Sequence, residues 1–118
     1  MRLLTMCVVV FVTLFTHANE SRAFVRGNEL VEWCVKPAEG DYPFTCLGYI
    51  MGVFDTIETQ IWVSNHESWP GLCIPPEVTR KQKFNVARKY LEDNPGSLHY
   101  GAAYLVSLAA IEAFPCSP

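Results

Sequence analysis

Apolar side chains recur at helical spacing along most of the chain, most regularly in residues 43–63. There they follow at alternating steps of three and four, at Leu47, Ile50, Phe54, Ile57 and Ile61. These steps place them on one face of an α-helix. Pro43 suits the first position of that helix, where a missing N–H costs nothing. The pattern therefore predicts a helix over about residues 43–63.

Two shorter helices are predicted, one over residues 29–35 and one over about residues 80–93. Asn28 is expected to cap the first. Its inward face then holds Leu30, Trp33 and Cys34. Thr79 and Gln82 have the spacing of a capping box, in which each side chain satisfies a main-chain N–H near the helix start. The inward face of this second helix holds Phe84, Ala87 and Leu91.

The last helix is predicted over about residues 98–114, where the segment AAYLVSLAAIEAF is apolar on almost every side. A helix of this kind is normally central, so we expect the others to cover it. No run of alternating apolar and polar residues predicts a strand. The expected fold class is all-α, a small four-helix domain. Gly48 and Gly52 share one helix face, and we expect them to let another helix approach closely.

The first residues have the pattern of a secretory signal peptide. Arg2 gives a positive start, residues 3–15 are an apolar run, and Ala18 or Ala23 offers a small residue for cleavage. We therefore expect residues 1–18 or 1–23 to be removed, and the mature helical domain of residues 24–118 to reach the periplasm. The alternative is a buried N-terminal helix. The other strongly apolar segment, YLVSLAAIEAF, is too short to span a membrane and contains Glu112, so no stable membrane anchor is expected.

Removal of the leader leaves four cysteines, which are Cys34, Cys46, Cys73 and Cys116. An even number in a small exported domain favours two disulfides. Zinc binding is the competing use, but the chain has no Cys-x-x-Cys pair. Four cysteines permit three connectivities, and spacing does not choose between them. If neighbouring helices are antiparallel, two corners form, so we predict Cys34 with Cys46 and Cys73 with Cys116.

The charge balance gives no support to nucleic acid or an anionic membrane as a partner. The chain has a net charge of −3, and loss of Arg2 with the leader makes it −4.

No catalytic or metal-binding residue is predicted, and no motif predicts a cofactor. Asp55 and Glu58 lie one helical turn apart, as a carboxylate pair would. We interpret Glu58 as solvated, and Asp55 as partly buried and bonded to a neighbouring helix. His66 and Glu67 have no further metal ligands near them in the sequence. His99 is interpreted as a surface or cap residue.

Four blocks of the chain resemble the Rap/Tai immunity proteins of type VI secretion systems: GNELVEWC, CLGYIMGVFDTI, CIPPEVTRKQKFNVARKYLEDNP and the terminal AFPC. The likeness spans about residues 24–116. It implies a small, helical, disulfide-bonded periplasmic protein, often dimeric, that binds and blocks a peptidoglycan amidase toxin delivered by a neighbouring cell. The chain itself would then not be an enzyme. The matched blocks mainly build helices and disulfides, so the resemblance bears more directly on the fold than on the partner.

An inhibitor of a hydrolase needs a rigid segment that enters the active-site cleft, and our candidate is the loop of residues 64–72. Cys73 fixes the end of this loop, and Trp69 is an anchor of the kind that dominates interface energies. The predicted contacts around Trp69 are Asn65, His66, Glu67 and Ser68. The alternative for Trp69 is that it folds back onto the core.

A second candidate surface is the basic side of residues 80–89, with Arg80 and Lys83 as its first contacts. It continues with Lys81, Arg88 and Lys89. The alternative is an ordinary solvated helix face. Two other functions stay open: a periplasmic stress or chaperone-like protein with loose binding to many clients, and an envelope structural protein without a toxin.

Overall fold

The computed structural model describes residues 24–35 and 44–117. Within them lie the helices α2 (Gly27–Cys34), α3 (Phe44–Val63), α4 (Arg80–Asp93) and α5 (Ala102–Ala113), with a short 3-10 turn, η1 (Pro95–Ser97), before α5. Those residues form no strand, only the isolated bridges Arg26–Gly101 and Leu72–Pro115. The predicted all-α class is confirmed. The expected leader, residues 1–18, lies outside the described residues.

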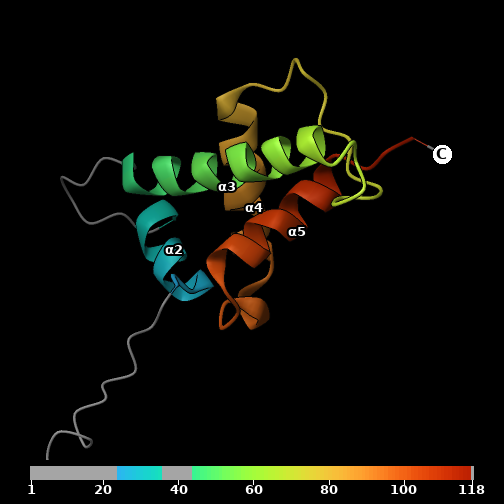
Figure 1. Cartoon of the computed structure of the whole chain (residues 1–118). Coiled ribbons are helices and arrows are strands. Elements are labelled where there is room, and N and C mark those ends of the chain that lie inside the picture. Colours follow the sequence, from blue (N-terminus) through green and yellow to red (C-terminus); the bar gives the residue numbers. More distant parts are fainter. Residues whose placement is uncertain (1–23, 36–43, 118) are drawn as a thin grey trace, which may run out of the picture.

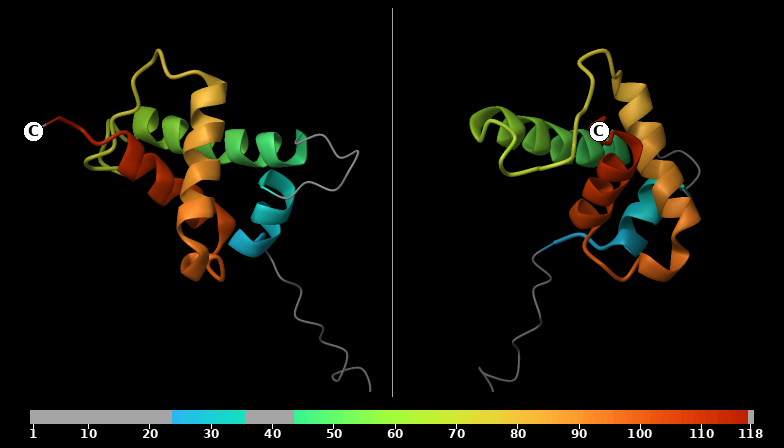
Figure 2. Two further views of the ribbon diagram at one scale, coloured as in Figure 1. Left: turned by 180° about the vertical axis from the view of Figure 1, so that it is seen from behind. Right: turned by 90° about the vertical axis from the view of Figure 1, so that its right-hand side faces the viewer.

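The longest helix, α3, spans the molecule, and each of the four helices contacts the other three (Figure 1). α4 crosses α3 near its middle, and α5 runs beside α4 (Figure 2). α2 lies against the first half of α3. No helix within the described part of the chain is long and apolar enough to cross a membrane.

The core forms where the four helices meet, and Leu30, Phe54 and Leu105 are among its fully buried side chains. The predicted inward faces are largely confirmed, since Ile50, Phe54, Ile57, Ala87 and Leu91 are all buried. Leu47, Ile61 and Phe84 are only partly buried. These three lie near helix ends, where fewer neighbours cover them.

α5 is less covered than its sequence predicts. It begins at Ala102 and not near residue 98, because η1 precedes it. Leu105 and Val106 are buried, but Tyr104 and Ile111 are 54% and 42% exposed. The other helices therefore cover one side of α5, as expected, and leave the side with Tyr104 and Ile111 open.

Main-chain hydrogen bonds to the segment before α5 fix the start of α2. The N–H groups of Gly27 and Asn28 donate to the carbonyl oxygens of Tyr100 and Leu98, both at 2.9 Å. These bonds satisfy donors that the first turn of a helix leaves unpaired. The cap residue is Arg26, so the predicted cap at Asn28 is wrong.

The predicted cap of α4 is confirmed. The hydroxyl of Thr79 accepts from the N–H of Gln82 at 3.2 Å, and Gln82 Oε1 accepts from the N–H of Thr79 at 2.7 Å. Thr79 itself has extended backbone angles, φ −75° and ψ 160°. The helix therefore begins at Arg80, directly after the residue that the capping box identifies.

Both predicted disulfides are present. Cys34–Cys46 joins the end of α2 to the first turn of α3, and Cys73–Cys116 joins the segment before α4 to the segment after α5. The predicted pairing is confirmed. Each bond restricts the unfolded chain and is expected to stabilise the fold by about 2–4 kcal/mol.

Gly48 and Gly52 do not bring another helix close, so that prediction is wrong. A Cβ atom on either glycine would meet no atom within 4 Å. The nearest helix on that face is α5, and a groove lined by Gly48, Gly52 and Ala103 separates the two helices. The close approach occurs at Gly27, where a Cβ atom would overlap the side chain of Leu105 and lie 2.9 Å from the carbonyl oxygen of Leu98.

Replacing the cap residue, Thr79→Ala, is expected to lower the free energy of unfolding by about 1 kcal/mol, because the N–H of Gln82 loses its acceptor. Thr59→Ala, on the exposed surface of α3, is the matched control and should change stability by less than about 0.5 kcal/mol. Urea unfolding followed by circular dichroism measures both. Equal effects of the two substitutions would contradict the capping role.

Replacing each of three glycines by alanine should change the free energy of unfolding in a direction that depends on the space around the glycine. Gly48→Ala and Gly52→Ala are each expected to raise stability by about 0.5–1 kcal/mol, because alanine is the better helix former and the space is open. Gly27→Ala is expected to destabilise, because the added methyl group collides with the main chain before α5. The same unfolding measurement tests all three, and a stabilised Gly27→Ala protein would contradict the observed packing.

Candidate functional site

The end of α3 and the first residues after it project from the body of the molecule. Figure 2 shows the last turn of α3 and the following loop extending to one side, away from α2. We call residues 62–68 the protrusion. It contains Asn65, His66, Glu67 and Ser68, predicted as partner contacts, and all four are exposed. The sequence therefore located an accessible segment, while its contact with a partner stays a prediction.

Local hydrogen bonds give the protrusion a defined shape. Ser64 Oγ donates to the carbonyl oxygen of Gln60 at 2.6 Å and accepts from the N–H of Ser68 at 3.1 Å. Asn65 and His66 have positive φ angles of 49° and 69°. The N–H of His66 donates to the carbonyl oxygen of Ile61 at 2.9 Å, which ends the helix in a left-handed turn.

The chain that follows the protrusion is clamped to the C-terminal segment. Besides the Cys73–Cys116 disulfide, the N–H of Cys73 donates to the carbonyl oxygen of Phe114, and the N–H of Cys116 donates to that of Gly71, both at 2.9 Å. Leu72, which lies between Gly71 and Cys73 in the chain, is 1% exposed. The clamp fixes where the loop returns to the body.

Trp69 does not project with the protrusion. It is partly buried against the core, and its indole N–H donates to Gln60 Oε1 at 2.8 Å. The ring lies at a groove of about 530 Å³ between α3 and α5, which Gly48, Gly52 and Ala103 also line. The position of Trp69 agrees with the alternative given in the sequence analysis, in which the ring folds back onto the core. A role of Trp69 in binding stays a prediction.

The exposed aromatic side chain of the protrusion is Trp62, which sequence reasoning missed. Trp62 is 82% exposed and its neighbour Val63 is 66% exposed. The sequence could have indicated this exposure. Trp62 directly follows Ile61, the last residue of the apolar stripe, and so points about 100° away from the core face. A tryptophan on the outer face of a soluble helix has no role in the core.

The two predicted contacts on α4 lie in different environments. Arg80 is exposed at the start of the helix. The side chain of Lys83 is only 13% exposed, and its Nζ lies 2.7 Å from both carboxylate oxygens of Glu58. The nitrogen also lies 5.5 Å from the centre of the Phe54 ring. Lys83 therefore joins α4 to α3 and is not part of an open basic face.

The same ion pair corrects our interpretation of the two carboxylates. Glu58 is partly buried and bonded to α4, whereas Asp55 is exposed, so the predicted environments are reversed. α4 covers the face of α3 that holds residues 54 and 58, one helical turn apart, and position 55 points away from it.

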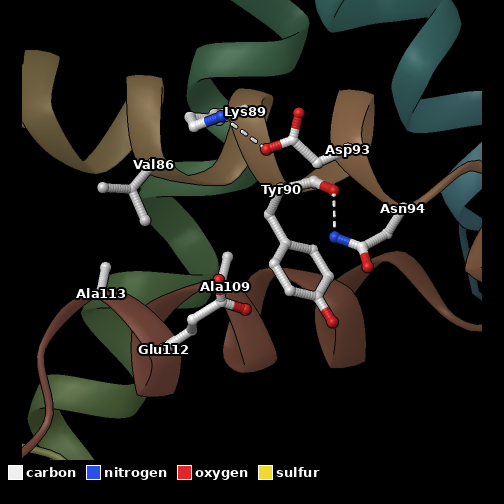
Figure 3. Close-up of a pocket in the computed structure, with 8 residues that line it drawn as sticks. All are labelled: Val86, Lys89, Tyr90, Asp93, Asn94, Ala109, Glu112 and Ala113. Atoms are coloured by element: carbon white, nitrogen blue, oxygen red, sulfur yellow. Dashed lines mark hydrogen bonds and ion pairs between the residues drawn. The ribbon is translucent and has the colours of Figure 1, made fainter.

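Polar side chains surround a hollow of about 220 Å³ between α4 and α5 (Figure 3). Lys89 Nζ lies 2.6 Å from Asp93 Oδ2, and Asn94 Nδ2 donates to the carbonyl oxygen of Tyr90 at 2.8 Å. Burial, and then the charges of Glu112 and Tyr104, raise the pKa of Tyr90 above its ordinary value. These groups mainly form hydrogen bonds and ion pairs with one another, so the hollow is a weaker candidate for a binding site than the protrusion.

Within residues 24–35 and 44–117, no group of three or more His, Cys, Asp or Glu side chains is placed to hold a metal ion.

A model of the Rap1a immunity proteins matches residues 26–116. The chain belongs to this family. The match contains all four helices, both disulfides and the protrusion, and it confirms the resemblance found in the sequence. No curated protein and no solved structure gives a match. A Rap1a immunity protein has a toxin as its partner, so exposed, well-ordered surfaces such as the protrusion are the places to look for contacts.

The two tryptophans should differ in their effect on folding. Trp69→Ala is expected to lower the free energy of unfolding by about 2 kcal/mol or more, because it removes a packed ring and its hydrogen bond to Gln60. Trp62→Ala is expected to change it by less than about 0.5 kcal/mol. Urea unfolding of both variants measures the difference. An equal loss in both would mean that Trp62 is packed in solution.

Proposed function

We propose that this Rap1a immunity protein is exported to the periplasm and there inhibits a peptidoglycan amidase toxin of a type VI secretion system. The leader pattern of residues 1–18 supports export, and the two disulfides suit an oxidising compartment. Family membership supports a toxin as the partner. The amidase is the target that the sequence resemblance implies.

The observation that carries the proposal is the exposure of Trp62 on a segment whose shape is already fixed. A large aromatic side chain that is 82% exposed has most of its surface available for burial in a partner. Aromatic anchors of this kind commonly supply 2 kcal/mol or more of binding energy. Because the local hydrogen bonds and the clamp order the protrusion in advance, binding loses little conformational entropy.

Inhibition by this route needs no chemistry from the immunity protein. The protrusion fills the cleft and excludes substrate, and the helices and disulfides hold it in place. In this proposal the chain is not an enzyme, and no residue of it reacts with the toxin or with peptidoglycan.

The inhibition test uses the purified amidase whose gene neighbours that of the immunity protein. Trp62→Ala is expected to weaken inhibition of peptidoglycan hydrolysis by at least about 30-fold, the equivalent of about 2 kcal/mol. Tyr104→Ala, which removes a 54% exposed aromatic ring from α5, is the matched control and should leave the titration curve unchanged. Substitutions of Asn65 and His66 should have smaller effects than Trp62→Ala.

Two results would contradict the proposal. One is an unchanged inhibition curve after residues 64–68 are replaced by glycine and serine together with Trp62→Ala. The other is weak binding to many unfolded proteins with no amidase inhibited, which would favour the chaperone-like alternative. Sedimentation of the same samples tests the homodimer that the resemblance implies.

A further inference from the structure

A second exposed surface lies at the other end of α3, beside the start of α4. Two adjoining hollows of about 470 and 330 Å³ share Leu47 and Arg80 in their lining. Their apolar surface comes from Phe44, Leu47 and Met51 on α3 and from Phe84 on α4. Phe44 is 72% exposed, and the other three are partly buried. We call this surface the α3–α4 groove. The first turn of α4 rises beyond α3 (Figure 2). Arg80 and Lys81 in that turn line the groove.

The cations of α4 fall into two groups. Lys83 pairs with Glu58 at 2.7 Å, Arg88 with Glu92 at 3.6 Å, and Lys89 with Asp93 at 2.6 Å. Arg80 and Lys81, by contrast, are exposed and form no ion pair with any residue that the structure describes. Both of these unpaired cations line the groove.

This positive charge is local and runs against the charge of the whole chain, which is −3. The first turn of α4 contains no acidic residue. Asp55 also lines the groove, and among the lining residues within 24–35 and 44–117 it is the only carboxylate. An apolar floor with unpaired cations at its rim is complementary to a segment that carries both an apolar side chain and carboxylates.

We propose that the α3–α4 groove binds an acidic segment of the toxin, with an apolar side chain between Leu47, Met51 and Phe84 and carboxylates on Arg80 and Lys81. The inference rests on the proposed function in one respect, namely that the partner is the toxin. Leu47 precedes Trp62 by 15 positions on the same helix, roughly 22 Å at 1.5 Å per residue. One partner is therefore able to contact the protrusion and the groove together.

The charged rim acts mainly on the rate of association. Opposite charges steer two proteins toward the productive orientation before the apolar contacts form, and salt screens this attraction. Loss of Arg80 and Lys81 is therefore expected to slow association, whereas loss of Trp62 is expected to speed dissociation. The two surfaces thus have separable kinetic signatures.

The first experiment needs no toxin. A probe peptide of sequence Glu-Glu-Leu-Phe-Glu-Glu, capped at both ends, is titrated into the ¹⁵N-labelled protein, and a peptide with lysine in place of glutamate serves as the control. The acidic peptide is expected to shift the amide signals of Leu47, Met51 and Arg80 and to leave those of the protrusion unchanged. Absence of shifts in the groove, or equal shifts with the lysine peptide, would overturn the inference.

The second experiment compares two double variants that each remove two positive charges from α4. Arg80→Gln with Lys81→Gln is expected to lower the association rate constant with the amidase by at least about fivefold at low salt, with the difference shrinking at 0.5 M NaCl. Arg88→Gln with Lys89→Gln, whose cations are already paired, is the matched control and should stay within about twofold of the unchanged protein. Equal effects of the two double variants would overturn the inference.

The outcomes separate this inference from the proposed function. If Trp62→Ala abolishes inhibition but the groove variant binds the amidase normally, the groove inference is wrong and the proposed function stands. If the acidic peptide binds in the groove but no amidase is inhibited, the chemistry of the groove stands and the proposed function fails. If the groove variant changes only the sedimentation of the protein, the groove is a contact between two copies and the inference is wrong.

Discussion

The bond between Cys73 and Cys116 holds the protrusion in a fixed place relative to the core. The two cysteines are 43 positions apart in sequence, so the loop that the bond closes contains both α4 and α5. Two main-chain hydrogen bonds of 2.9 Å and the buried side chain of Leu72 reinforce it. A loop anchored in this way keeps its shape without a partner, and binding then requires little further ordering.

α3 connects this anchored end to the rest of the molecule. Its first turn is bonded to α2 through Cys34–Cys46, and its middle is held by the burial of Phe54 and by the Glu58–Lys83 ion pair with α4. The side chain of Lys83 is 13% exposed, so removing Glu58 would leave the lysine charge poorly solvated. Because a helix fixed at several points moves as one body, Trp62 and Leu47 keep a constant separation.

Helix positions and the cap of α4 could be predicted from the sequence because each depends on local chemistry. The capping box at Thr79 and the stripe from Ile50 to Ile57 are signals carried by neighbouring residues. The errors arose where the angle between helices decides the outcome. The open space at Gly48 and Gly52 depends on how α5 lies beside α3. The reversal of Asp55 and Glu58 depends on which face of α3 is crossed by α4. Periodicity identifies the inward face of a helix, and it does not say which neighbour covers each part of it.

The candidate site shows the same division between local and tertiary information. The sequence correctly predicted an exposed loop after α3, since polar turn residues between helices lie on the surface. It assigned the anchor to Trp69, but the hydrogen bond with Gln60 that holds this ring against α3 depends on how the loop folds back. Trp62, Arg80 and Lys81 are exposed, and none of them takes part in the core or in a disulfide. Under the proposed function, substitutions at these three positions change the contacts with the toxin while the scaffold stays intact, because the residues that fold are separate from the residues that bind.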